Sequence, residues 1–352
     1  MSRQDIYYWK CDRPAAFHGT APRGERDALI AQPLADALRE YFNTHEINLR
    51  PAATQGNHLA FHAVIQGRAA FIRVEDGPER DNHLAVESVV LDRVREAGVR
   101  TPCVLGCDAT RDRVPFAWQA LERISTADLN HWFKAGTLDR DRIAFQIGES
   151  IAKWQGIVCP GFGTLDHALS GGRPSYADYF HLRLDEHLHF LKARGFLEDA
   201  NEIRSAIQEH SALLSVDRGC LVHKDLALWN ILGANDRIEA FIDFDDSISG
   251  DPTDDLSLLA CFHDSAFLKR AEEGYRSVRP LPSEYRRRLW LHLLRNMIVK
   301  AVIRVGAGYF DRTDNFFLIG SGRSGADLER TTRERLATAL CGLRDNLDVD
   351  IL

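Results

Sequence analysis

The residue types and spacing best suited to chemistry lie in two short motifs between positions 221 and 243 of the 352-residue chain. In the first motif, Asp225 follows two residues after His223, and Asn230 follows five residues after Asp225. In the second, Asp243 stands between two apolar residues, thirteen positions beyond Asn230. An aspartate can accept the proton of an attacking hydroxyl, while an amide oxygen and a second carboxylate can hold magnesium against nucleotide phosphates. The pattern therefore predicts a site for phosphoryl transfer.

Apolar periodicity predicts the elements that position these residues. In the first part of the chain we predict two helices, over residues 32–43 and 82–97. The predicted strands are 60–65 and 70–74, joined by a turn at Gln66-Gly67, and 104–105 and 115–121. From residue 127 helical patterns dominate, interrupted by two short strands that carry the motifs: 127–135, 140–157, 175–194, 197–214, from 255, 283–305 and 326–344.

A small strand-rich lobe with one helix, followed by a large helical lobe, is the sequential layout of a kinase-type fold. We therefore predict an α+β, two-lobed, protein-kinase-like fold. Residues 1–46 are expected to form an N-terminal extension and helix, and 47–123 an N-lobe with an antiparallel sheet that binds the nucleotide. Residues 124–352 are expected to form a helical C-lobe with the catalytic loop, metal site and substrate pocket. The aromatic and basic residues of 1–25 would pack on the main body or serve self-association, which leaves a homodimer open.

Charge, cysteine content and hydropathy indicate where the protein is located and which partners it is not expected to bind. A net charge of -7 and a pI near 6.1 argue against nucleic acid, whose phosphates select basic surfaces. The seven cysteines are scattered and form no Cys-x-x-Cys, which predicts neither a disulfide framework nor a zinc knuckle. Neither a signal peptide nor an apolar run of membrane-spanning length is recognisable. We expect a cytoplasmic protein that binds neither nucleic acid nor membrane.

Segment 221–258 resembles the aminoglycoside phosphotransferase and choline kinase superfamily of small-molecule kinases. The resemblance runs through Leu-Val-His-x-Asp-Leu-x-x-x-Asn-Ile-Leu, then Ile-Asp-Phe, then Gly-Asp-Pro-x-x-Asp-Leu. Gly161-Phe162-Gly163 is also similar, and with the first-lobe features the resemblance extends over residues 48–262. It implies the protein-kinase-like fold.

The resemblance implies a role for each motif residue. Asp225 would be the catalytic aspartate, which orients the acceptor hydroxyl and takes its proton. Asn230 and Asp243 would hold Mg²⁺. His223 and Asp255 would support the catalytic loop, although an ordinary helix N-terminal aspartate explains Asp255 nearly as well.

The first lobe would contribute the nucleotide-binding residues, comprising a phosphate-covering turn, a basic strand residue with its helix partner, and the hinge between the lobes: Gly56, Asn57, Arg73, Glu87, Leu121 and Arg123. Arg73 occupies the place of a phosphate-binding lysine, and arginine is not a neutral replacement because its guanidinium is planar and permanently charged. The alternative for Arg73 is an exposed strand residue. Glu87 falls on the apolar face of its helix, which favours a buried ion pair.

Two further features depart from a familiar pattern. Lys224 stands where antibiotic kinases commonly have glycine. It would pair with an acid or reach a phosphate, or else be solvated or stabilise the loop. Residues 241–264 contain seven aspartates and no lysine or arginine, a density that either holds cations or repels itself. Asp245 and Asp246 could in addition face a cationic substrate.

The function favoured by these features is a Mg²⁺-dependent kinase that transfers the terminal phosphate of ATP or GTP to a hydroxyl of an aminoglycoside-like antibiotic, a sugar or an amino alcohol. A protein serine/threonine kinase is the near alternative, but Ala227 replaces the expected basic residue and no Ala-Pro-Glu element follows Asp243. A catalytically impaired nucleotide-binding regulatory protein is a second alternative. A metal-dependent hydrolase is a third alternative, but the sequence has no pair of histidines at a spacing suited to binding a metal.

Overall fold

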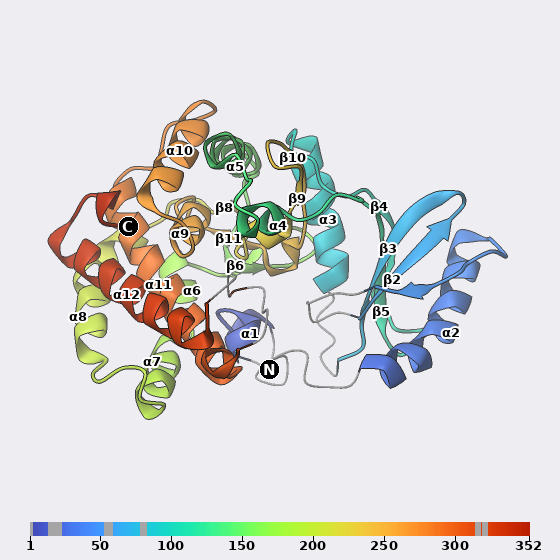
Figure 1. Cartoon of the computed structure of the whole chain (residues 1–352), viewed down its shortest axis with the longest axis horizontal. Helices are drawn as coiled ribbons and strands as arrows, with labels where there is room; N and C mark the ends of the chain where they lie inside the picture. The colour runs from blue at the N-terminus through green and yellow to red at the C-terminus, as the bar shows by residue number, and fades with distance from the viewer. Residues whose placement is uncertain (1–2, 13–22, 53–58, 78–82, 314–317, 319–322) are drawn as a thin grey trace.

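The chain forms two lobes of unequal size in the computed structural model, which describes residues 3–12, 23–52, 59–77, 83–313, 318 and 323–352 (Figure 1). A sheet and its helices make the smaller lobe, and helices with a few short strands make the larger one. This arrangement confirms the predicted α+β, two-lobed, kinase-like fold.

The smaller lobe is built on an antiparallel sheet with the strand order β1-β2-β3-β5-β4. Four of its described strands overlap the predicted ranges: β2 (Leu59–Ile65), β3 (Arg68–Glu75), β4 (Val104–Asp108) and β5 (Ala117–Glu122). The short strand β1 (Arg50–Pro51) had no predicted range of its own. The predicted turn between β2 and β3 is present, because Gln66 and Gly67 both adopt positive φ, as a tight antiparallel hairpin requires.

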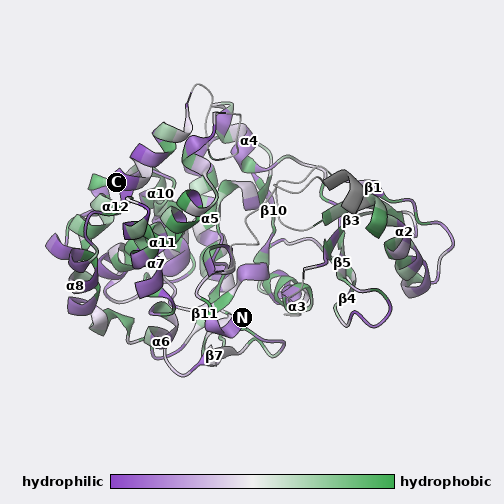
Figure 2. Ribbon diagram, turned by 90° about the horizontal axis from the view of Figure 1, so that it is seen from below, coloured by the Kyte–Doolittle hydropathy of each residue, from purple (hydrophilic) through white to green (hydrophobic). Residues whose placement is uncertain are grey.

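Two helices lie on opposite sides of this sheet (Figures 1 and 2). Helix α2 (Arg23–Phe42) buries Leu34 and Leu38 in a common core with the sheet, and Pro33 lies inside the helix. The helix begins nine residues before the predicted start at position 32, and it belongs to the small lobe rather than to a separate extension. Helix α3 (His83–Glu96) instead packs its apolar face into the core of the larger lobe, which joins the two lobes.

The larger lobe surrounds a central buried helix, α11 (Tyr285–Gly306). Its apolar stripe, which includes Trp290, Leu294 and Met297, is core as predicted. The predicted helix 175–194 is divided into two at Arg183, whose φ of 57° is incompatible with a continuous helix. The described helices around α11 are α4 (Leu129–Lys134), α5 (Arg140–Trp154), α6 (Tyr176–Phe180), α7 (Leu184–Ala193), α8 (Asn201–Glu209), α9 (Asp254–Ala260), α10 (Ser265–Arg276) and α12 (Gly325–Asp345).

Short strands in the larger lobe carry the predicted motifs toward the small lobe. These strands are β6 (Phe162–Leu165), β7 (Gly171–Arg173), β8 (Cys220–Val222), β9 (Ile231–Gly233), β10 (Ile238–Phe241) and β11 (Ile248–Gly250). Four of them form a sheet with the order β7-β6-β11-β8, and β9 and β10 form a separate hairpin. The first motif begins at the end of β8 and the second follows β10 directly. None of the helices in the described ranges is long and apolar enough to cross a membrane.

Candidate active site

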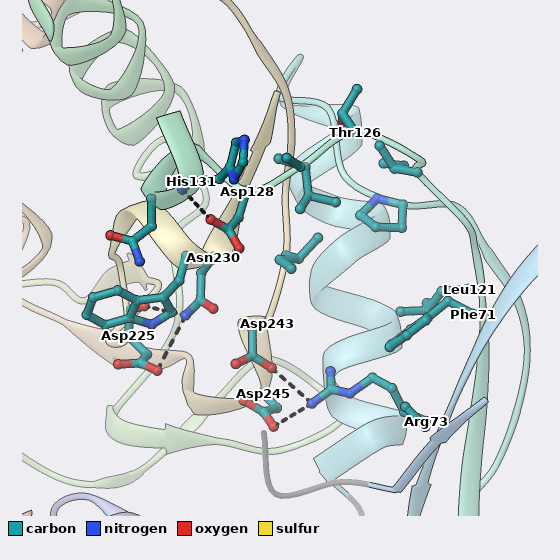
Figure 3. A pocket seen from close by; sticks show the side chains of 18 of the residues that line it. Phe71, Arg73, Leu121, Thr126, Asp128, His131, Asp225, Asn230, Asp243 and Asp245 are labelled. Carbon is teal, nitrogen blue, oxygen red and sulfur yellow. Dashed lines mark hydrogen bonds and ion pairs between the residues drawn. The ribbon is translucent and has the colours of Figure 1, made fainter. Parts of the chain in front are cut away.

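A cavity of about 780 Å³ lies between the lobes, and it is lined by the residues predicted for phosphoryl transfer. Asp225, Asn230 and Asp243 line it from the larger lobe, and Arg73 lines it from strand β3 (Figure 3). Positive φ angles at Lys224 (70°) and Asp243 (67°) turn the chain sharply at both motifs. Non-glycine residues rarely adopt this conformation, and its cost is tolerated mainly where the surrounding structure holds the residue in place.

Asp225 lies between two ammonium groups. Lys300 from α11 lies 3.2 Å from one carboxylate oxygen, and Lys10 lies 2.9 Å from the other. Lys10 belongs to helix α1 (Trp9–Asp12), the end of an N-terminal segment, residues 3–12, that packs against the larger lobe. Burial alone would raise the pKa of Asp225, but Lys10 and Lys300 outweigh it and hold that pKa below its ordinary value. The carboxylate is therefore ionised and able to orient a hydroxyl.

Asn230 and Asp243 offer the oxygen atoms that magnesium prefers. The Asn230 amide nitrogen donates to the backbone oxygen of Asp225 at 2.7 Å, which leaves the amide oxygen as the group available to a cation. The Asp243 side chain is 31% exposed, and only one of its carboxylate oxygens accepts from Arg73. Burial and the Asp245 carboxylate raise the pKa of Asp243, so a bound cation would favour its ionised form. This donor set fits Mg²⁺.

Arg73 joins the two lobes through three carboxylates, of which Asp243 and Asp245 are drawn in Figure 3. Its guanidinium lies 2.5 Å from Glu87 on α3, 3.0 Å from Asp243 and 2.9 Å from Asp245. The other Glu87 oxygen accepts a hydrogen bond from the backbone nitrogen of Phe244 at 3.0 Å. Arg73 is therefore buried and paired, as the position of Glu87 indicated, and is not an exposed strand residue.

Asp255 holds the catalytic loop by its backbone. Its carboxylate accepts hydrogen bonds from the backbone nitrogens of His223 (3.1 Å) and Lys224 (3.2 Å) and from the indole of Trp154 (2.9 Å). The His223 ring is fully buried and lies 3.0 Å from the carbonyl of Ile242, next to the second motif. The two residues expected to support the loop thus connect both motifs to the core.

Lys224 is buried and paired with an acid, one of the alternatives left open by its position. Its ammonium lies 2.7 Å from Asp254, 2.8 Å from the Tyr7 hydroxyl and 3.3 Å from the Asn296 side chain. Burial lowers the pKa of Lys224, but Asp254 and Tyr7 reverse this and raise it above the ordinary value. Lys224 therefore stabilises the loop and attaches it to the N-terminal segment.

The N-terminal segment, like Lys300, is a part of the site that sequence reasoning missed. The Tyr7 ring stacks on the Tyr179 ring with a centroid distance of 4.8 Å. The Arg295 guanidinium also lies over the Tyr7 ring, 3.6 Å from its centroid. The only signal for this docking was the run of aromatic and basic residues from Tyr7 to Lys10, which indicated packing without its location. The segment is a wall of the cavity, to which Tyr8, Trp9 and Lys10 contribute.

A hydrogen-bonded group fixes the end of this segment to α7. Cys11, Asp12 and His187 offer three ligand-type atoms within 4.8 Å of one another. The ring nitrogen Nδ1 of His187 faces the Arg295 guanidinium at 3.1 Å, so Nε2 carries the proton and donates to Asp12 at 2.7 Å. Asp12 also accepts from two backbone nitrogens of its own segment. Hydrogen bonding accounts for this group, which serves as an anchor.

The dense aspartates of 241–264 are largely neutralised by cations from elsewhere in the chain. Asp245 pairs with Arg73, and Asp246 lies 3.5 Å from Arg3 and 4.0 Å from Lys10. The carboxylates of Asp245 and Asp246 therefore face cations of the protein itself, whereas the sequence also allowed them to face a cationic substrate.

Only some of the residues predicted to bind the nucleotide can be located at the cavity. Leu121 and Arg123 line the cavity where β5 passes into the linker between the lobes. The backbone nitrogens of Glu122 and Arg123 already donate to the carbonyls of Cys103 and Ala69. Gly56 and Asn57, expected in the phosphate-covering turn, lie outside the described residues.

A two-lobed kinase-type fold, with an aspartate, an asparagine and a second aspartate on one wall of its interlobe cavity, defines a phosphotransferase that acts on a hydroxyl acceptor. A sequence profile described as the phosphotransferase enzyme family matches residues 49–291, and the chain belongs to this family. No curated protein sequence matches it significantly.

Solved structures share the fold at low sequence identity. A thermostable mutant of aminoglycoside phosphotransferase APH(4)-Ia, in ternary complex with AMP-PNP and hygromycin B, has a TM-score of 0.63 at 17% identity, covering 87% of this chain and 97% of that one. A putative fructosamine-3-kinase from Haemophilus somnus has a TM-score of 0.59 at 15% identity, covering 86% and 96%. A macrolide 2'-phosphotransferase from Brachybacterium faecium has a TM-score of 0.52 at 18% identity, covering 87% and 98%.

Proposed function

We propose that the protein is a Mg²⁺-dependent kinase that transfers the terminal phosphate of ATP or GTP to a hydroxyl of a small molecule. The observation that carries this proposal is the placement of Asp225, Asn230 and Asp243 on one wall of the cavity, opposite Arg73. Three of the solved structures with the same fold are complexes with ADP or AMP-PNP, which supports a nucleotide as the donor.

The nucleotide would lie on the small-lobe side of the cavity. Its base would pack against the apolar residues Phe71 and Leu121 near the linker, and its phosphates would extend toward Arg73. Arg73 would bind phosphate through the N–H donors not engaged by Glu87, Asp243 and Asp245, because a guanidinium has five N–H donors. Asn230 and Asp243 would hold Mg²⁺, which offsets the charge that develops on the transferring phosphoryl group.

The acceptor would lie on the larger-lobe side, next to Asp225. The ionised carboxylate would accept a hydrogen bond from the acceptor hydroxyl and direct its oxygen at the terminal phosphorus. As the new O–P bond forms and the bond to the nucleoside diphosphate breaks, the hydroxyl proton passes to Asp225. Lys10 and Lys300 would hold the carboxylate in position for this step.

One observation favours the catalytically impaired regulatory protein as a second candidate. Both carboxylate oxygens of Asp225 are engaged by lysines, so an acceptor must share or displace one of these contacts. A regulatory protein would bind nucleotide without turning it over.

The two candidates are separated by measuring nucleotide binding and turnover on the same preparation. Isothermal titration with ADP and GDP, with and without Mg²⁺, tests the site itself. ADP release with ATP is then measured across aminoglycosides, macrolides, sugars, amino alcohols and hydroxy acids. The kinase predicts Mg²⁺-dependent binding and ADP release that requires an acceptor. Tight binding without acceptor-dependent release would instead support the regulatory protein.

A further inference from the structure

Basic side chains gather on the acceptor side of the cavity. Lys300 and Arg304 both line it from α11, and Lys10 faces them from the N-terminal segment. Residues four apart share one face of a helix, and four residues rise about 6 Å along its axis. Arg304 therefore lies one helical turn beyond the lysine that contacts Asp225.

Among the buried arginines, Arg304 has the fewest hydrogen-bond partners in the described part of the chain. It is 5% exposed, and its one hydrogen bond in the described part of the chain goes to the Thr332 hydroxyl at 2.7 Å. Arg73, by contrast, is surrounded by three carboxylates, and Arg295 donates to the backbone carbonyls of Phe180 and Leu182. A buried charge without a counter-ion is costly, and burial lowers the pKa of Arg304 to about 10.

We propose that Arg304 binds an anionic group of the acceptor, a carboxylate or a phosphate, while the acceptor hydroxyl reaches Asp225. This inference rests on the proposed kinase function and names its substrate class. The separation of Lys300 and Arg304 along the helix requires the hydroxyl and the anion to lie several bonds apart. Lys300 adds positive charge between these two points.

The surroundings of this site oppose a polycationic acceptor. Three carboxylates line the cavity from the larger lobe, and all are paired with cations of the chain: Asp225 with Lys10 and Lys300, and Asp243 and Asp245 with Arg73. The other acidic lining residues, Glu122 and Asp128, belong to the linker and the cap of α4, away from α11. Aromatic side chains complete the acceptor side and suit an apolar body between hydroxyl and anion: Tyr8, Trp229, Phe262 and Tyr309.

Two matched sets of compounds test the charge preference directly. The first is glucuronate, glucose 6-phosphate, glucose and glucosamine, which separates carboxylate from phosphate. The second is 4-(hydroxymethyl)benzoate, its methyl ester and 4-(aminomethyl)benzyl alcohol, which keeps the hydroxyl and the ring while the charge changes. Binding to the full chain is measured by isothermal titration in the presence of Mg²⁺ and AMP-PNP, and acceptor-dependent ADP release is measured with ATP.

The proposal predicts that an anion binds about ten- to a hundredfold more tightly than its neutral partner, the range expected of a charge-assisted contact. Arg304→Gln should abolish that preference without changing the affinity for AMP-PNP, and Arg304→Lys should keep part of it. Arg330→Gln, at an exposed arginine, is the control variant. Lys300→Gln, with a smaller predicted loss, is the second test if Arg304→Gln does not fold.

Anions that bind no better than their neutral partners, or a preference that survives in a folded Arg304→Gln variant, would overturn the proposal. If that variant does not fold, a preference that survives Lys300→Gln unchanged would do so. Failure of the kinase function itself looks different, since no acceptor, anionic or neutral, would then give ADP, whether or not AMP-PNP binds. The relative affinities of carboxylate and phosphate within the sugar set identify which anion the site takes.

Discussion

The ammonium of Lys10 lies 2.9 Å from the carboxylate of Asp225, although 215 positions separate them in the chain. An N-terminal segment thus reaches the residue that would orient the acceptor, and it is held there by contacts from Tyr7 and Asp12 to the larger lobe. Direct contacts of Lys10 with Asp225 and of Tyr7 with Lys224 therefore join the N-terminal segment to the loop that carries Asp225.

Removing the Lys10 charge should impair turnover more than nucleotide binding. In Lys10→Met, Asp225 keeps Lys300 and Asn230 but loses one of its two ion pairs, and a misplaced catalytic group can cost about a hundredfold in rate. We expect kcat to fall about ten- to a hundredfold and the Kd for Mg²⁺ and ADP to change little. Steady-state kinetics and titration calorimetry measure these values, with Lys10→Arg as the charge-conserving control. A rise in kcat would instead show that Lys10 blocks the acceptor site.

Arg73 should be essential to stability because three buried or half-buried carboxylates depend on it. Arg73→Gln leaves Glu87, Asp243 and Asp245 without their common partner, and breaking a buried ion pair typically costs about 3–5 kcal/mol. Arg73→Lys should lose less, because an ammonium can still meet one carboxylate. Urea unfolding measures both, and the double variant Arg73→Gln/Glu87→Gln should recover part of the loss. A loss below about 1 kcal/mol in Arg73→Gln would show that this pairing contributes little.

Asp255→Asn should loosen the catalytic loop. The amide keeps only one acceptor oxygen for three donors, and its NH₂ group would face backbone N–H groups. We expect a loss of about 2–3 kcal/mol in the free energy of unfolding, as for an unsatisfied buried group, together with a lower kcat. The exposed Asp217→Asn is the matched control. Full stability with normal kcat would leave Asp255 as an ordinary helix N-terminal residue.

Acid should destabilise the fold through His263. This ring packs on Phe267 at a centroid distance of 4.1 Å, and burial lowers its pKa from 6.5 to about 3. The folded pKa is below the unfolded one, so the contribution is complete above pH 6.5 and is lost as pH falls toward 3. From pH 7 to pH 5 the loss should be roughly 2 kcal/mol. His263→Phe should flatten the pH dependence of urea unfolding, whereas substitution of the exposed His45 should not. An unchanged profile in His263→Phe would rule out this residue as the source.

The sequence predicted the parts of the site that depend on local chain geometry. Asp225, Asn230 and Asp243 lie within one stretch of loop and hairpin, so their spacing nearly determines their proximity. Glu87 was recognisable as a partner of Arg73 because a charge on the apolar face of a helix needs a counter-ion.

The remaining features depend on long-range packing. Lys10 comes from a segment whose docking position no local pattern encodes, and Lys300 and Arg304 lie at the end of a helix that otherwise reads as core. The predicted helix over 175–194 failed at Arg183 for a related reason, because its break is a single left-handed residue in an otherwise helical pattern.

The most direct test of the account compares the wild type with Asp225→Asn, using the acceptor that gives the highest rate. Asparagine keeps the size of the side chain but cannot take the acceptor proton. Acceptor-dependent ADP release should fall by at least about a hundredfold, the lower range for a general base, while Mg²⁺ and ADP still bind and thermal unfolding shows a folded protein. Release within a few-fold of the wild type in a folded Asp225→Asn variant would contradict the assignment of this cavity as the site of phosphoryl transfer.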